Sequence, residues 1–345
     1  MTVSQGAPRP GSVLHRAARL EDAVHRRIER RLSGRGWVPT ISGYTGYGAP
    51  GWVRVMARVL LTRPDPRKNR RPELVRGWRS FTTVPVADAE VVVVAGRRTH
   101  TLRTDRGGYV DVDLEADLPV GWGEVELRTE GAEPVRARVR VIDPEVGFGV
   151  ISDVDDTVMV TSLPRPMLAA WNTFVLNEHA RRPVPGMAVL YERMVNAHPG
   201  APVVYISTGA WNVAPTLSRF LGRHLYPAGP ILLTDWGPTK SGWFRSGREH
   251  KRQSLARLAR EFPNMRWLLV GDDGQHDPEL YSGFARSHPE NVAGVAIRHL
   301  SPAEQVLASG LPVPMEQAEA VPDVLWVSAP DGAGLSEQLQ RIGLL

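Results

Sequence analysis

The hydrophobic pattern of this chain changes near residue 145, and that change limits the possible folds more than any other feature. From about residue 37 to 145, apolar and polar residues alternate with a period of two, as in WVRVMARVLL and VRARVRVID. After residue 145, continuous apolar runs alternate with longer stretches of helical spacing. The first pattern is typical of half-buried strands, and the second of a parallel sheet covered on both faces. We therefore expect two different folding units in the 345 residues.

We predict an α/β protein whose doubly wound parallel sheet follows an all-β, sandwich-like domain. The predicted divisions are a basic amphipathic helix over 1–36, the all-β domain over 37–145 and the α/β domain over 146–345. Strands of the parallel sheet are expected at 147–152, 202–208, 230–236, 266–273, 292–300 and 323–328. Helices are expected at 164–180, 186–197, 212–223, 248–262, 277–287 and 334–342.

Composition excludes several classes of protein. The chain has no cysteine, so disulfide frameworks, thiolate metal sites and cysteine nucleophiles are ruled out. It shows neither the apolar core of a secretory signal nor an apolar run long enough to span a bilayer, and we expect a cytoplasmic protein. The net charge of +5 comes from residues 1–36, and the rest of the chain is balanced in charge. We expect no nucleic-acid partner. No motif in residues 37–145 predicts a particular protein partner for the β domain.

Two segments leave the question of peripheral membrane contact open. The basic helix near the N-terminus either packs its apolar stripe on the next domain or lies on an anionic membrane surface. The loop GPTKSGWFRSGREH sets Trp243 and Phe244 beside arginines. That combination suits a bilayer interface, and it suits packing in a core equally well.

Acidic side chains follow the first strand of the predicted parallel sheet. GVISDVDDTVMV places Asp153, Asp155 and Asp156 directly after an apolar run. Ligands of such sheets bind beyond the carboxyl ends of the strands, so the ends of other strands should meet there. Those ends carry Ser207, Thr208, Asp272 and Asp273, and Asp277 follows one turn later. A calcium loop or a solvated turn is the alternative, but the EF-hand pattern requires glycine where this chain has Val158.

Such a cluster of carboxylates predicts a hard divalent cation, and Mg²⁺ is the expected cofactor. Asp153 would act as a nucleophile on phosphorus, and Asp155, two residues on, as general acid and base. Ser207 and nearby backbone amides would stabilise the transferring group, and Lys251 would supply a cation. Lys251 is one of three lysines beside 39 arginines, which indicates that a compact ammonium is needed there. Lys240 is the rival for that role.

DVDDT, YISTG, Lys251 and GDDGQHD follow one another in the order of the four motifs of haloacid dehalogenase-like phosphatases. More narrowly, ISDVDDTV, PVVYISTGAWN and LVGDDGQHDPELY resemble the catalytic domain of the actin-patch type of phosphatidate phosphatase, over roughly residues 146–330. The resemblance implies a haloacid dehalogenase-like sheet and Mg²⁺-dependent conversion of phosphatidate to diacylglycerol. Asp273 departs from the pattern, because the family often has a small residue there.

The resemblance assigns roles by position. It implies that Asp153, Asp155, Ser207 and Lys251 are catalytic, and that Asp153, Asp155, Asp272 and Asp277 form the metal site. Thr157, Thr208 and Gly209 are the candidate substrate-binding residues. We predict hydrolysis of a phosphomonoester, with a phosphorylated lipid as substrate. A phosphatase for phosphoproteins or small metabolites, and a catalytically silent scaffold, are the alternatives.

Overall fold

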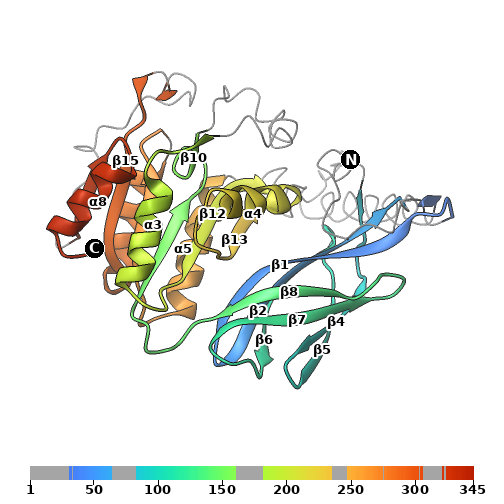
Figure 1. The fold of residues 1–345 in the computed structure, drawn as a ribbon. Coiled ribbons are helices and arrows are strands. Elements are labelled where there is room, and N and C mark those ends of the chain that lie inside the picture. Colours follow the sequence, from blue (N-terminus) through green and yellow to red (C-terminus); the bar gives the residue numbers. More distant parts are fainter. Residues whose placement is uncertain are drawn as a thin grey trace, which may run out of the picture.

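The structure is a computed structural model (Figure 1), and it describes part of the chain. The described residues are 31–32, 34–63, 83–160, 182–234, 247–274, 276–302, 304–305, 321 and 324–345. Most of the predicted N-terminal helix, the helix predicted at 164–180, Lys240 and the loop with Trp243 and Phe244 lie outside them.

The first half of the chain forms one eight-stranded sheet in the order β3-β2-β1-β8-β7-β4-β5, with β6 paired to β2. All its strand pairs are antiparallel except β1 with β8, so the sheet is mixed. Alternate residues of β2, from Val53 to Leu61, are buried in its core. The strands are β1 (Val38–Ala49), β2 (Gly51–Thr62), β3 (Val84–Pro85), β4 (Glu90–Ala95), β5 (Arg98–Arg103), β6 (Tyr109–Ala116), β7 (Gly121–Thr129) and β8 (Val135–Val141).

The second half contains a six-stranded sheet in the order β13-β12-β9-β14-β15-β16, and every pairing in it is parallel. All six strands lie within two or three residues of the predicted ones. They are β9 (Phe148–Asp153), β12 (Val203–Ala210), β13 (Ile231–Thr234), β14 (Arg266–Asp272), β15 (Val292–Arg298) and β16 (Trp326–Ala329). A short ribbon of β10 (Met159–Val160) and β11 (Arg182–Pro183) follows β9.

Helices lie on both faces of the parallel sheet. In Figure 1, α3 and α8 lie side by side on the near face, where Arg193 of α3 hydrogen-bonds to Ser336 and Gln340 of α8. The pair α5 and α6 is joined by an ion pair between Arg248 and Glu279. The helices are α3 (Met187–Ala197), α4 (Ala214–Arg223), α5 (Gly247–Glu261), α6 (Asp277–Ser287) and α8 (Gly332–Arg341), with 3-10 turns η4 (Trp211–Val213) and η5 (Pro289–Asn291). Among the described helices, none is long and apolar enough to cross a membrane.

The predicted fold class is wrong. Strands make up 42% and helices 28% of the described residues, so the molecule is mainly β and is not a clear haloacid dehalogenase-like doubly wound fold. The N-terminal half is one curled sheet, and the predicted two-sheet sandwich is not formed. The reason is that β6 pairs with β2, in the register Gly51 with Ala116, and the curled sheet then encloses its own apolar core. Alternation of apolar and polar residues predicts that a segment is a strand, but it does not predict which other strand that segment pairs with.

Candidate active site

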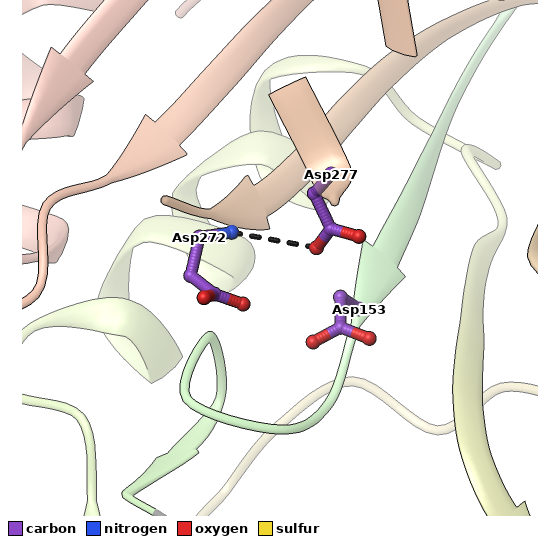
Figure 2. Close-up of side chains that lie close together, drawn as sticks. All are labelled: Asp153, Asp272 and Asp277. Atoms are coloured by element: carbon purple, nitrogen blue, oxygen red, sulfur yellow. Dashed lines mark hydrogen bonds between the residues drawn. The ribbon is translucent and has the colours of Figure 1, made fainter. Parts of the chain in front are cut away.

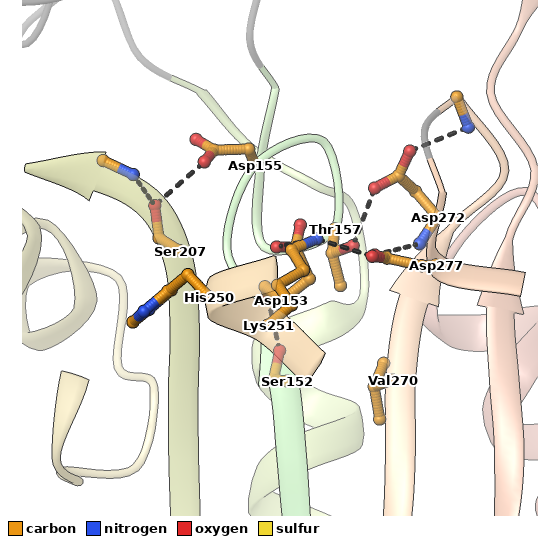
Figure 3. Close-up of polar contacts among 12 residues, drawn as sticks. Ser152, Asp153, Asp155, Thr157, Ser207, His250, Lys251, Val270, Asp272 and Asp277 are labelled. Carbon is orange, nitrogen blue, oxygen red and sulfur yellow. Dashed lines mark hydrogen bonds and ion pairs between the residues drawn. The ribbon is translucent and has the colours of Figure 1, made fainter. Parts of the chain in front are cut away.

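Three neighbouring strands of the parallel sheet bring the predicted polar residues together. β9 lies between β12 and β14, and Asp153 is the last residue of β9, as Asp272 is of β14. In the register of β9 with β12, Ile206 is opposite Asp153, and Ser207 follows directly. Because parallel strands end at one edge of a sheet, these side chains converge there, as Figure 3 shows.

Asp153, Asp272 and Asp277 form a buried group of three carboxylates (Figure 2). One oxygen from each lies within 4.8 Å of the others. At most 1% of each residue is exposed. Asp277 is the first residue of α6, and its Oδ2 accepts the Asp272 amide at 3.5 Å. This close approach requires Gly271, since a Cβ there would lie 2.6 Å from Asp277 Oδ2.

Lys251 is the cation that faces this group. Its Nζ lies 2.7 Å from Asp153 Oδ1 and 2.5 Å from Asp277 Oδ1, and the residue is 4% exposed. Burial by itself would lower the pKa of Lys251, but the charges of Asp153, Asp277 and Asp272 outweigh it and raise that pKa above its usual value. The side chain therefore stays an ammonium.

The charge balance of the site leaves room for a second cation. Burial raises the pKa of Asp153 well above its usual value; Asp277 and Asp155 add to the effect, and Lys251 opposes it. Burial, followed by Asp277 and Asp153, likewise raises the pKa of Asp272. Asp153 Oδ2 is buried and has no hydrogen-bond partner among the described residues. Three carboxylates against one ammonium, with an unbonded oxygen, fit a divalent cation held by oxygen ligands.

Asp155 lies outside the group of three carboxylates and beside Ser207. Ser207 Oγ donates to Asp155 Oδ2 at 3.0 Å, and the Gly209 amide donates to Ser207 Oγ at 3.0 Å. Both Asp155 and Ser207 are buried. This pair flanks Asp153 on the side away from Asp272 and Asp277 (Figure 3). Of the four predicted metal ligands, the structure therefore groups three and places Asp155 with the hydroxyl.

The remaining predicted residues have structural partners. Thr157 is fully buried, and its Oγ1 donates to Asp272 Oδ2 at 3.3 Å. The backbone carbonyls of Thr208 and Gly209 both accept the hydroxyl of Thr234. Thr208 also packs closely against Gly247, the first residue of α5. A Cβ at position 247 would lie only 2.5 Å from Cγ2 of Thr208, so a larger residue would not fit there. These contacts position Asp272, the end of β12 and the helix of Lys251.

Asp273, the departure from the family pattern, is used elsewhere. Its Oδ2 lies 2.8 Å from His299 Nδ1, and its Oδ1 accepts the Leu300 amide at 2.8 Å. It therefore anchors the segment after β15 and contacts neither Asp153 nor Asp277 in the described structure. Asp273 is the first residue after β14, and its contacts with His299 and Leu300 direct it toward the segment after β15.

Sequence reasoning missed Arg298. Its Nη1 donates to the Asp156 carbonyl at 2.6 Å, and its Nη2 lies 2.7 Å from Glu304 Oε1. Asp156 has a φ of 58°, a conformation that is uncommon outside glycine. Arg298 thus supports the turn between Asp153 and Thr157. A lone arginine at the end of a strand gave no signal for this role.

The site is a group of buried carboxylates at the edge of a parallel sheet that could hold a metal ion, and one family of known proteins matches the segment that contains it. Residues 148–299 match the family described as phosphatidate phosphatase APP1, catalytic domain. That segment is less than half of the chain, and it is similar to the catalytic domain of this phosphatase family. The predicted resemblance to these catalytic domains is confirmed, and the wider haloacid dehalogenase-like assignment is not.

Two relatives match over part of their length. The chain is 28% identical over 203 residues to phosphatidate phosphatase APP1 of Saccharomyces cerevisiae, which covers 56% of this chain and 34% of that protein. It is also 28% identical over 163 residues to an uncharacterised protein of Schizosaccharomyces pombe, covering 47% of this chain and 26% of that protein. The chain thus spans about a third or less of the length of these relatives.

A carbohydrate acetylesterase from Xanthomonas citri aligns with 10% identity and a TM-score of 0.28, covering 76% of this chain and 71% of that one.

Proposed function

We propose that residues 148–299 hydrolyse a phosphomonoester in a Mg²⁺-dependent reaction, and that the substrate is a phospholipid of the phosphatidate type. One observation carries this proposal: Asp153, Asp272 and Asp277 form a buried group inside the segment that matches the family, and Lys251 forms ion pairs with Asp153 and Asp277. The substrate class is supported by the name of the yeast relative, a phosphatidate phosphatase.

Asp153 is the proposed nucleophile. One of its oxygens binds the Lys251 ammonium at 2.7 Å, which fixes the carboxyl group and opposes the rise of its pKa that burial causes. The other oxygen has no hydrogen bond among the described residues, so it can reach an electrophile without first breaking a contact. It would attack phosphorus and displace the substrate alkoxide, leaving an aspartyl-phosphate.

Asp155 is the proposed general acid and base. It would give a proton to the departing alkoxide, and then take a proton from the water that attacks the aspartyl-phosphate, which releases phosphate and restores Asp153. Ser207 holds Asp155 by its hydrogen bond of 3.0 Å and would also donate to a phosphoryl oxygen.

Asp153, Asp272 and Asp277 are the proposed ligands of Mg²⁺, with Thr157 and the Gly274 amide, 2.8 Å from Asp272 Oδ1, orienting Asp272. When bound, the ion would neutralise charge on the phosphoryl oxygens. The Lys251 ammonium, which contacts the carboxylates in this structure, would also interact with the negatively charged phosphate of the substrate.

A cavity beside the catalytic turn offers room for the rest of the substrate. Its volume is about 700 Å³, and it is lined by both apolar and charged side chains, including Val160, Leu300, Arg182 and Arg298. Glu304 and Asp331 also line it, so basic and acidic groups lie beside the apolar ones. Arg298 links this cavity to the turn that carries Asp155.

The test is release of inorganic phosphate from vesicles of phosphatidate in phosphatidylcholine, with Mg²⁺ or with EDTA, beside a soluble aryl phosphate and a phosphopeptide. Asp153→Asn is the inactive variant. Asp88→Asn is the matched control, because Asp88 lies in the turn between β3 and β4 and its side chain is 79% exposed. We expect Mg²⁺-dependent turnover of phosphatidate. Turnover of the soluble esters alone would refute the lipid substrate, and no turnover of any ester would favour a silent scaffold.

A further inference from the structure

We propose that the curled sheet positions the catalytic residues, and that Tyr44 does so by fixing Trp211 and, through it, the segment that carries Ser207. This inference rests on the proposed phosphatase function. It makes Tyr44 a positioning residue located in the other half of the chain.

Trp211 is the point at which the curled sheet contacts the end of β12. Its ring centroid lies 4.5 Å from that of Tyr44 on β1 and 6.4 Å from that of Tyr109 on β6, and it is 6% exposed. The guanidinium of Arg58 lies 4.2 Å from the Tyr109 ring on β6, which holds that ring in place. Aromatic contacts at these distances favour defined geometries.

The segment between Ser207 and Trp211 is the end of β12, and it is anchored on one side by Thr234, whose hydroxyl donates to the carbonyls of Thr208 and Gly209. It consists of Thr208, Gly209 and Ala210, which are small side chains. The contact with Thr234 holds the segment from the side of β13, and Trp211, which follows Ala210 directly, contacts the curled sheet on the other side. The sheet holds one end, and Trp211 between the two tyrosines holds the other.

A second contact joins the curled sheet to the helix of Lys251. Glu261, the last residue of α5, accepts Arg54 Nη2 at 2.5 Å and the Tyr47 hydroxyl at 2.7 Å. Arg257, one turn earlier, lies 2.8 Å from Asp111 Oδ2, and Arg54 lies 2.9 Å from Asp111 Oδ1. Lys251 lies about 15 Å away along the same helix. Because a helix is stiff, fixing its end fixes the direction of Lys251.

Buried ion pairs of this kind define orientation more than they add stability. Arg54 is 7% exposed, and burial opposes the ionisation of Asp111, but Arg257 and Arg54 outweigh it and lower its pKa. The curled sheet therefore contacts two elements of the proposed site separately. One is α5, which carries Lys251, and the other is the end of β12, which carries Ser207 and is followed by Trp211. Tyr44 affects only the one that carries Ser207.

The experiment uses the full chain and compares Tyr44→Ala, Tyr44→Phe and Trp122→Ala. Trp122 is the matched control, since it is 38% exposed on β7 and stacks on Arg138 at 4.2 Å. Turnover of a soluble aryl phosphate with Mg²⁺ gives kcat and KM, and amide hydrogen exchange is followed over residues 207–213.

We expect Tyr44→Ala to lower kcat by about 10- to 100-fold, because a displacement of about 1 Å costs about that much. KM should change less than about threefold, since donors to a transferring phosphoryl group act chiefly in the transition state. Exchange over 207–213 should accelerate at least about tenfold. Tyr44→Phe keeps the ring, and it should stay within about threefold of wild type, as should Trp122→Ala.

If Tyr44→Ala does not fold, Tyr44→Leu keeps an apolar side chain without a ring and should show the same pattern at smaller amplitude. A folded variant with unchanged kcat and unchanged exchange would overturn this inference alone. A wild-type chain that releases no phosphate from any ester would overturn it together with the proposed function.

Discussion

Replacing Lys251 with methionine removes the ammonium between Asp153 and Asp277 while keeping most of the side-chain volume. Both carboxylates then stay buried, with Asp272 beside them, and the ion pairs of 2.7 and 2.5 Å are lost. Removing one partner of a buried pair leaves an uncompensated charge, which costs about 3–5 kcal/mol. At about 2–4 °C for each kcal/mol in a domain of this size, the melting temperature should fall by roughly 6–20 °C in EDTA.

The loss should shrink when a divalent cation is added. Mg²⁺ at about 100 times its dissociation constant stabilises wild type by about 2.7 kcal/mol, and it should stabilise the variant more, because it replaces part of the missing positive charge there. The loss should also shrink at low pH, because protonation neutralises the carboxylates. The loss of melting temperature is therefore compared in EDTA and in Mg²⁺. A loss caused by electrostatics should differ between the two conditions, whereas a loss caused by poorer packing should be the same in both.

Thermal denaturation followed by circular dichroism measures this effect. Arg252→Met is the matched control, since Arg252 lies on the same helix, its side chain is 66% exposed, and its ion pair with Glu249 is at the surface. It should leave the melting temperature nearly unchanged. A Lys251→Met protein that melts within about 2 °C of wild type in EDTA would contradict the electrostatic reasoning.

Three further predictions concern the carboxylates. Asp153→Asn should reduce phosphate release at least about a thousandfold and raise the melting temperature in EDTA, because it removes a buried charge; a variant with appreciable turnover would count against the nucleophile. Thr157→Val removes the 3.3 Å hydrogen bond to Asp272, and a Mg²⁺ titration of activity should need about 10- to 100-fold more metal; an unchanged titration would exclude that supporting role. The raised pKa values of Asp153 and Asp272 mean that the folded protein binds more protons than the unfolded chain above about pH 4, so stability in EDTA should fall as pH rises toward those raised values. Melting at pH 5 and pH 8 checks this, and higher stability at pH 8 in EDTA would contradict it.

The convergence of Asp153, Ser207 and Asp272 could be predicted from sequence. Apolar runs mark parallel strands, and parallel strands end at one edge, so residues far apart in the chain are placed together by topology alone. The bounds of α6, with Asp277 at its start and Pro278 in its first turn, followed from helix-start signals in the same way.

Side-chain partners and strand pairing in the first half could not be predicted. Nothing local specifies that Thr157 turns to Asp272 or that Lys251 bonds both Asp153 and Asp277, because those choices depend on packing across the sheet. The pairing of β6 with β2 also depends on long-range packing, and for that reason the sandwich prediction failed. The domain boundaries, and membrane contact by Trp243 and Phe244, stay predictions, since the latter two residues lie outside the described part of the chain.

Detection of phosphate on Asp153 tests the proposed catalysis most directly. The Asp155→Asn protein, which lacks the proposed base for the second step, is mixed with substrate and Mg²⁺, quenched in acid, digested and analysed by mass spectrometry. One phosphoryl group should appear on the peptide that contains Asp153, and it should be absent when EDTA replaces Mg²⁺ or when Asp153 is also changed to asparagine. Phosphate on another residue, or rapid turnover without any labelled peptide, would contradict the assignment of Asp153.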